Sequence, residues 1–151
     1  MRALIQRVSM SRVRVDDITV GEIEQGLLVL LGVAPDDAIA DRDWLLRKIL
    51  NLRVFANEAG RMNRSVTDIE GGLLVISQFT LFADAGQGNR PSFTRSAPPE
   101  FAESAYNNFL EKLRQNHSGS VATGRFAAGM QVELINDGLV TLLLDSKQKN
   151  F

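Results

Sequence analysis

The sequence has no cysteine and a single histidine, and this composition excludes several kinds of active site. Without cysteine there is no disulfide, no zinc thiolate and no cysteine nucleophile. The one histidine, His117, lies in a polar run after an expected helix, so we predict a surface position and no Ser-His-Asp triad. The carboxylates are not clustered at metal-ligand spacing, and we therefore predict no metal and no cofactor.

The chain also lacks an excess of charge of either sign and a long apolar run. Its 17 Lys and Arg against 18 Asp and Glu leave a formal net charge of −1. Proteins that bind nucleic-acid backbones usually carry a basic excess, so composition argues mildly against an RNA function, and any RNA contact has to be local. No apolar stretch approaches the ~18 residues of a membrane span, and charges near Met1 leave no signal-peptide core. We expect one cytoplasmic domain over residues 1–151.

Short apolar stretches and two amphipathic segments indicate an α/β domain with a mostly β core and two main helices packed outside. Helices are predicted to start near Pro35 and Pro98, because apolar residues then recur at helical spacing. A turn at residues 16–17 divides the second strand segment, and Asn136-Asp137-Gly138 is typical of a hairpin turn between the last two strands. Strand segments are expected at 3–8, 13–23, 27–33, 53–55, 73–82, 131–135 and 140–144.

The segment Ser77-Gln78-Phe79-Thr80 is the most informative one for function. It follows the apolar run 73–76 inside the strongest strand candidate. A buried strand rarely carries three hydrogen-bonding side chains in four positions without partners. A strand with its polar residues on a wet face explains the pattern. The functional alternative is a strand end that presents hydroxyls, an amide and free backbone N–H groups to a substrate.

A glycine-rich loop at residues 86–93 gives a weaker signal. It contains one arginine and ends at Pro91-Ser92-Phe93, without the Lys-Ser/Thr ending of a P-loop. An ordinary exposed loop explains it equally well. Without the family resemblance, the residues 136–138 are explained by an ordinary hairpin turn with no functional role.

Several segments taken together resemble the D-aminoacyl-tRNA deacylase family. No single segment is specific, but they occur in family order with family-like spacing and cover nearly the whole chain. They are Ala3 to Val8, Gly26 to Val33, Ser77 to Leu81, Arg90 to Phe93, Thr123 to Phe126 with Met130, and Asn136 to Thr141.

The resemblance implies a three-layer β/β/α domain that forms a homodimer with active sites at the subunit interface. In the family, a Ser-Gln-Phe-Thr segment, here residues 77–80, lines the pocket for the 3′-terminal adenosine of tRNA and its ester-linked amino acid. A Gly-Pro-Val-Thr segment, here Gly138-Leu139-Val140-Thr141, reaches in from the other subunit and excludes L side chains. Arg7 matches an arginine that braces this motif, and Met130 matches a residue beside the pocket.

This sequence departs from the family pattern at Leu139, where the family has proline. The family's Gly-Pro peptide is cis, and a cis bond costs ~0.5–1 kcal/mol before proline but ~2.5–4 kcal/mol before any other residue. A trans bond at Gly138-Leu139 would turn the carbonyl groups and weaken the chiral filter. An enforced cis bond would preserve the filter with stored strain. The sequence leaves both arrangements open.

The resemblance implies hydrolysis of D-aminoacyl-tRNA, and of mischarged glycyl-tRNA, to free amino acid and tRNA. We assign the backbone N–H groups of Phe79 and Thr80 to the oxyanion, with Ser77 and Gln78 as orienting groups. Thr80 as a nucleophile is the alternative, although no activating base is visible. Contacts to the terminal 2′-hydroxyl and adenine would select RNA. Candidates for phosphate contacts are Arg61, Arg64, Arg90 and Arg95.

Other interpretations stay open on this sequence. One is a non-catalytic nucleic-acid-binding module with a degenerate pocket, which would bind uncharged tRNA or DNA without turnover. Another is a deacylase with relaxed chirality caused by Leu139, acting mainly on glycyl-tRNA or small mischarged amino acids. A dimeric structural protein has no positive support in the sequence.

Overall fold

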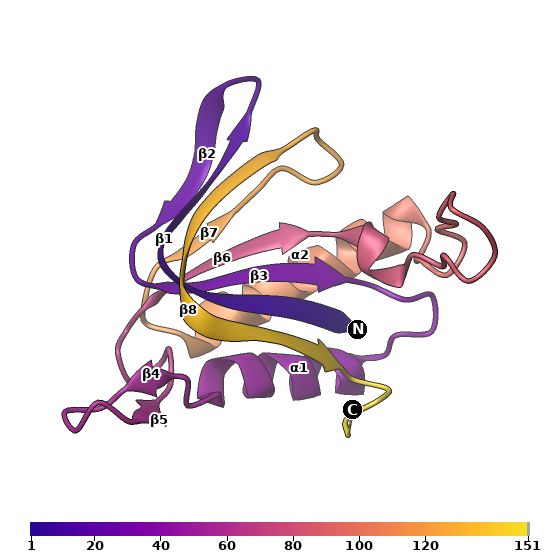
Figure 1. Ribbon diagram of the computed structural model, residues 1–151. Coiled ribbons are helices and arrows are strands. Elements are labelled where there is room, and N and C mark those ends of the chain that lie inside the picture. Colours follow the sequence, from indigo (N-terminus) through magenta and orange to yellow (C-terminus); the bar gives the residue numbers. More distant parts are fainter. Residues whose placement is uncertain (151) are drawn as a thin grey trace.

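One long strand organises the molecule, which the computed structural model describes over residues 1–150. This strand, β1 (Arg2–Val15), pairs antiparallel with β3 along its first half, with β2 along its second half, and with β8 on its other edge. Figure 1 shows β1 and β8 bending together across the molecule. The other elements are β2 (Ile18–Ile23), β3 (Gly26–Gly32), α1 (Ile39–Asn51), β4 (Phe55–Ala56), β5 (Met62–Arg64), β6 (Gly72–Ser77), the 3-10 turn η1 (Phe79–Phe82), α2 (Pro99–Asn116), β7 (Val121–Thr123) and β8 (Gln131–Asp145).

The main sheet has six strands in the order β2-β1-β3-β6-β7, with β8 paired to β1. Strands β3, β6 and β7 are parallel, and a helix lies in each connection between them, as parallel pairing requires. Strand β2 folds back toward β7 so closely that a Cβ atom on Gly21 would overlap the Thr123 carbonyl oxygen. The sheet is therefore nearly closed and barrel-like. The predicted α/β class with a mostly β core and two outer helices is confirmed.

Two apolar clusters pack on opposite faces of the sheet. Side chains of β3 point alternately to the two faces. Leu27, Val29 and Leu31 belong to the cluster shared with the helices, whereas Leu28 belongs to the cluster inside the curved sheet. Each such fully buried side chain contributes about 1.5–3 kcal/mol. Helices α1 and α2 cover the first face (Figure 1). They bury residues at helical spacing, namely Leu45, Leu46, Ile49, Leu50, Ala102, Tyr106, Phe109, Leu110 and Leu113.

Several element boundaries differ from the sequence-based expectation for local reasons. The segments expected at 3–8 and 13–15 form one strand, because polar Ser11 is buried and donates to the Glu133 carbonyl at 3.0 Å. Helix α1 starts at Ile39, not near Pro35, since the Asp41 carboxylate accepts from the Ala38 N–H at 2.8 Å and caps the helix there. The short strand expected at 53–55 is β4, shifted to residues 55–56.

The hairpin predicted at Asn136-Asp137-Gly138 is wrong. Strand β8 continues through this segment, and both of its halves pair with β1. Val8 is opposite Asn136 and Gln6 is opposite Thr141, so four residues of β8, 137–140, are opposite the single residue Arg7 of β1. The turn-forming residues therefore produce an extended β-bulge within a single strand.

The predicted surface position of His117 is also wrong. Its side chain is buried at the end of α2, and Nε2 donates to the Gly71 carbonyl oxygen at 2.7 Å. This bond ties the end of α2 to the turn that precedes β6. The polar residues around His117 gave no indication of this, because the contact is 46 residues away along the chain. Within residues 1–150, no helix is long and apolar enough to cross a membrane.

Candidate active site

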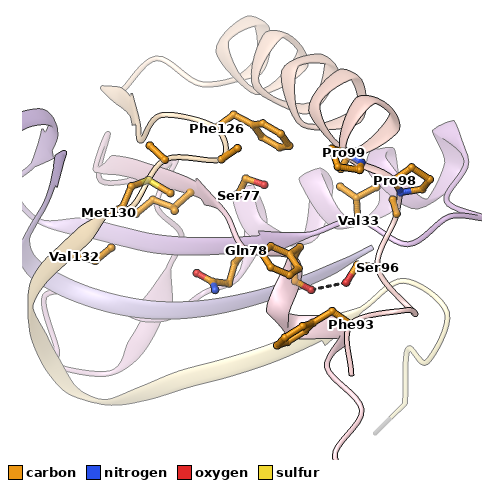
Figure 2. A pocket seen from close by; sticks show the side chains of 16 residues that line it. Val33, Ser77, Gln78, Phe93, Ser96, Pro98, Pro99, Phe126, Met130 and Val132 are labelled. Atoms are coloured by element: carbon orange, nitrogen blue, oxygen red, sulfur yellow. Dashed lines mark hydrogen bonds between the residues drawn. The ribbon is translucent and has the colours of Figure 1, made fainter. Parts of the chain in front are cut away.

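A cavity of about 680 Å³ opens at the carboxyl ends of the parallel strands β3 and β6. The first turn of α2 closes one side, and the segment leading into β8 closes the other (Figure 2). Crevices beyond the carboxyl ends of parallel strands are the usual position of ligand sites in α/β sheets. The lining residues are mostly apolar: Val33, Ile76, Ser77, Gln78, Phe79, Phe93, Ser96, Ala97, Pro98, Pro99, Ala102, Phe126, Ala127, Ala128, Met130 and Val132.

None of the residues that line this cavity has an ionisable side chain. The polar side chains at its wall are those of Ser77, Gln78 and Ser96. Across residues 1–150 there is also no group of three or more His, Asp or Glu residues placed to hold a metal ion. The lining of this chain can therefore offer hydrogen-bond donors, acceptors and shape, but no general acid or base.

The segment 77–80 changes from strand to 3-10 turn at the mouth of the cavity. The strand predicted to run to Phe82 ends at Ser77, and the Gln78 N–H makes the last ladder contact, 2.8 Å from the Leu31 carbonyl. Phe79 and Thr80 then open η1, where the first N–H groups have no carbonyl within the turn. Among the described residues, neither N–H donates to another backbone carbonyl. Two adjacent N–H donors are thus free at the end of β6.

The side chain of Thr80 is held by Gln78, whose Nε2 donates to the Thr80 Oγ1 atom. Thr80 is not among the cavity-lining residues, although Ser77, Gln78 and Phe79 are. With the hydroxyl oxygen engaged as an acceptor and no ionisable side chain in the lining, Thr80 has no activated nucleophile geometry here. Of the two hydroxyl side chains in this segment, that of Ser77 is at the cavity wall and that of Thr80 is not.

Aromatic rings form the rim of the cavity. Phe79 is about half exposed and meets Phe93 edge to face, with ring centroids 5.2 Å apart and planes at 73°. Ser96 Oγ donates to the Phe79 carbonyl at 3.0 Å, the contact drawn in Figure 2. The Ala97 N–H donates to the Val33 carbonyl, also at 3.0 Å. These bonds fix the segment before α2 against η1 and β3, so the rim is rigid at its base.

The opposite wall carries Met130, Phe126, Ala127 and Val132. A Cβ atom on Gly124 would lie 2.5 Å from the Met130 sulfur, so glycine at that position leaves room for this side chain. Sequence reasoning did not find Phe126 or Ser96 as lining residues. Both lie within or beside segments that carry the family resemblance, 123–126 and 90–93, and this was the only available signal.

The bulge at Gly138 and Leu139 lies apart from this cavity, and none of residues 138–141 lines it. Leu139 is fully exposed (103%) and has a left-handed backbone with φ of 62°. Its peptide bonds are trans, as are all those between residues 1 and 150. Val140, in contrast, points into the core and is 4% exposed. The predicted selection segment is therefore a protrusion anchored by one core residue.

Arg7 braces this protrusion. Its Nε donates to the Asp137 carbonyl and one terminal nitrogen donates to the Gly138 carbonyl, both at 3.0 Å, while the other donates to the Val54 carbonyl. An ion pair to the Asp137 carboxylate at 3.3 Å completes the set. A planar guanidinium can serve several acceptors at once, which explains why one arginine holds both sides of the bulge. The carbonyl groups of residues 137 and 138 are consequently fixed in direction.

Comparison with known proteins gives the family of this chain. The family model described as D-Tyr-tRNA(Tyr) deacylase matches residues 4–145. A relative from Xanthomonas oryzae pv. oryzae (strain MAFF 311018), called D-aminoacyl-tRNA deacylase, is 55% identical over 95% of this chain and 99% of its own length. A relative of the same name from Clostridioides difficile (strain 630) is 53% identical over 98% of this chain and 99% of its own length. This chain belongs to the D-Tyr-tRNA(Tyr) deacylase family.

Solved structures show the same fold. One described as c-Myc DNA Unwinding Element Binding Protein has a TM-score of 0.92 and 41% identity, and the match covers 96% of this chain and 98% of that one. A second, described as a probable eukaryotic D-amino acid tRNA deacylase, has a TM-score of 0.77 over 95% of this chain and 98% of that one. At 17% identity, this second likeness shows the shared fold alone.

Proposed function

We propose that this chain hydrolyses the ester that joins a D-amino acid, or mischarged glycine, to the terminal ribose of tRNA. The observation that carries the proposal is the cavity beside Ser77 to Phe79 in a member of the deacylase family. Its apolar lining suits an adenine ring and an amino-acid side chain, and the free N–H groups of Phe79 and Thr80 stand at its mouth. We further propose that the protein acts in the cytoplasm, where charged tRNA is used.

The proposed chemistry depends on positioning and backbone hydrogen bonds. Water attacks the ester carbonyl carbon, the N–H groups of Phe79 and Thr80 stabilise the oxyanion, and the bond to the ribose oxygen breaks as that oxygen takes up a proton. A donor of this kind contributes roughly 10²–10³ in rate. Because the lining has no ionisable side chain, the neighbouring ribose 2′-hydroxyl is the group best placed to move protons. Ser77 and Gln78 orient the ester.

Thr80→Val tests this assignment, because it removes the hydroxyl and keeps the backbone N–H. We expect the hydrolysis rate to fall by no more than about tenfold, through loss of the Gln78 contact. Circular dichroism and thermal unfolding check that the variant is folded. Near-complete loss of hydrolysis in a folded Thr80→Val protein would instead assign the nucleophile to the threonine hydroxyl.

The proposal includes a homodimer in which the bulge of one subunit completes the cavity of the other. A fully exposed leucine in a left-handed conformation costs about 1–2 kcal/mol and stabilises nothing in its own chain. Strand β8 leaves further apolar side chains exposed, namely Ile135 and Leu143. A second copy that covers this face would bury them and bring Leu139 to the partner's cavity.

Mixing two inactive variants tests the shared site. Met130→Arg places a long charged side chain in the cavity, and Leu139→Asp alters the bulge. If the bulge acts in the partner's cavity, a one-to-one mixture allowed to exchange subunits regains about a quarter of wild-type activity, because half of the dimers then hold one intact site of two. A mixture as inactive as its components would contradict the shared site. Analytical ultracentrifugation establishes the oligomeric state.

The primary experiment follows the ester bond of one tRNA charged separately with D-tyrosine, L-tyrosine and glycine. Rapid loss of the D-tyrosyl and glycyl esters with the L-tyrosyl ester intact supports the proposal and means that trans Gly138-Leu139 still excludes L side chains. Hydrolysis of all three esters supports the deacylase with relaxed chirality. Hydrolysis of none by folded protein refutes the proposed reaction.

A nucleic-acid-binding module without catalysis is the second candidate, and one observation bears on it. The solved structure at 41% identity is described as a DNA-binding protein, whereas the relatives at 53–55% identity are called deacylases. The net charge of −1 argues against general affinity for DNA backbones. Tight binding of duplex or single-stranded DNA with no turnover of any aminoacyl ester would favour the binding module.

A further inference from the structure

The segment between η1 and α2 projects from the domain (Figure 1), and its residue Phe93 lines the cavity. Its base is fixed, because Asp84 and Ser92 exchange two backbone hydrogen bonds of 2.8 Å and Phe93 packs against Phe79. Its tip has no such support: every residue from 83 to 95 is exposed. Gly88 has φ of 83°, and a Cβ atom there would have nothing within 4 Å. The tip therefore makes no packing contact that would explain its length.

Positive charge is concentrated on this segment although the chain as a whole is not basic. From residue 85 to residue 99 the only ionisable side chains are those of Arg90 and Arg95. Neither forms an ion pair with a carboxylate in the described chain. Asp84, at the base, uses its carboxylate to accept from the Gly86 N–H at 2.9 Å. Two cations without an ion pair, against the single acid Asp84, leave this exposed loop with an excess of positive charge that complements a chain of phosphates.

Arg95 also lines a second hollow, of about 220 Å³, whose wall includes the carboxylates of Asp36 and Asp145. The other cations in its wall are already paired: Arg2 with Asp145 at 2.7 Å, and Lys147 with Asp41 at 2.9 Å. Arg95 is the one cation of this hollow that lacks such a partner among residues 1–150. Its charge is therefore available to a ligand that passes the rim of the main cavity.

We propose that Arg90 and Arg95 form a contact surface for the phosphodiester backbone of the strand whose 3′ end occupies the cavity. This inference rests on the proposed function, because it assigns Arg90 and Arg95 to the tRNA nucleotides that precede the terminal adenosine. Phe93 lines the cavity, and the two arginines are three and two residues from it, within ~10 Å and ~7 Å along the chain. A strand that leaves past the Phe79–Phe93 pair meets both. Backbone contacts of this kind tolerate any base sequence.

The test compares two substrates that share one ester: tRNA charged with D-tyrosine, and 3′-O-D-tyrosyl adenosine, which has no phosphate. Arg90→Ala and Arg95→Ala should each lower kcat/KM for the tRNA ester about three- to tenfold, the value of one exposed charged contact. Both should leave kcat/KM for the adenosine ester unchanged. Arg47→Ala, which removes a positive charge from the exposed face of α1, is the matched control and should change neither.

Salt dependence gives a second measurement on the same variants. The slope of log kcat/KM for the tRNA ester against log salt concentration should become shallower by about 0.7 for each arginine removed. Equal losses on both esters would overturn the inference, because the arginines would then support the cavity itself. Unchanged rates and slopes on the tRNA ester would also overturn it. If wild-type protein hydrolyses neither ester, the proposed function fails; if it hydrolyses both and the variants keep their ratio, only the arginine surface fails.

Discussion

Replacing Arg7 with methionine tests how the β8 bulge is held, because it removes the guanidinium and keeps an unbranched side chain in its space. Three carbonyl oxygens lose a charged donor, those of Asp137 and Gly138 at the exposed bulge and that of Val54 in a partly buried position. Hydrogen bonds to charged groups contribute about 1.5–3 kcal/mol, and exposure lowers this to about 1 kcal/mol for each of the first two. The free energy of unfolding should therefore fall by about 3.5–5 kcal/mol. For a domain of this size, Tm should fall by roughly 7–20 °C.

Urea unfolding measures the change, with the midpoint lowered and the slope preserved if only the native state is affected. Arg12→Met is the matched control, since it removes a guanidinium from the same strand whose pair with Glu133 is solvent-exposed, and its effect should be far smaller. The ratio of rates on D-tyrosyl and L-tyrosyl tRNA should also fall for Arg7→Met, because the bulge carbonyls lose their direction. Wild-type stability together with an unaltered ratio would refute the bracing role.

Three further predictions concern the rest of the fold. A Cβ atom on Gly26 would overlap the β6 backbone, so Gly26→Ala should abolish the near-ultraviolet circular dichroism of folded protein, whereas Gly129→Ala, with open space around it, should not. Burial raises the pKa of Tyr106, the only tyrosine, to about 12. Its absorbance titration should therefore lie about two pH units above that in urea, and the stability it provides is present below about pH 10 and lost as pH rises toward 12. Burial alone would raise the pKa of Asp41, but hydrogen bonds from a backbone N–H at the start of α1 and from Lys147 lower it to about 2. Its contribution is present above about pH 4 and lost as pH falls toward 2, so Asp41→Asn should flatten the acid limb of a thermal-unfolding series. A normal spectrum for Gly26→Ala, coincident tyrosine titrations or an unaltered acid limb would each contradict the corresponding reasoning.

The spacing of apolar residues along the sequence predicted those strands and helices whose buried side chains follow that spacing. The apolar run at 27–33 became β3, and the amphipathic segment after Pro98 became α2. Both succeed because a buried strand or a half-buried helix leaves its spacing in the sequence. The segment at Ser77 was found for a similar reason: polar residues interrupt an apolar strand where the strand ends.

Features set by distant contacts were not predictable in this way. Asn136-Asp137-Gly138 has the residues of a hairpin turn, and only its pairing with β1 on both sides makes it a bulge. His117 sits in a polar run but bonds to Gly71 across the fold. The cavity combines residues from several separate segments, so Ser96 becomes a lining residue only when α2 packs against the sheet. The spacing of apolar and polar residues within one segment contains no information about contacts with distant segments.

The pairing of β1 with β8 also governs when the site can form during folding. It joins Arg2 to Asp145 and Val8 to Asn136, contacts that close very long loops and are therefore slow to form. Met130 and Val132 in the cavity wall lie beside or on β8, and the Leu139 bulge is part of it. A chain in which β3, β6 and the helices have already associated thus has the Ser77 segment in place without a second wall. Ester hydrolysis should appear in refolding experiments only with the last slow phase, well after helical signal has returned.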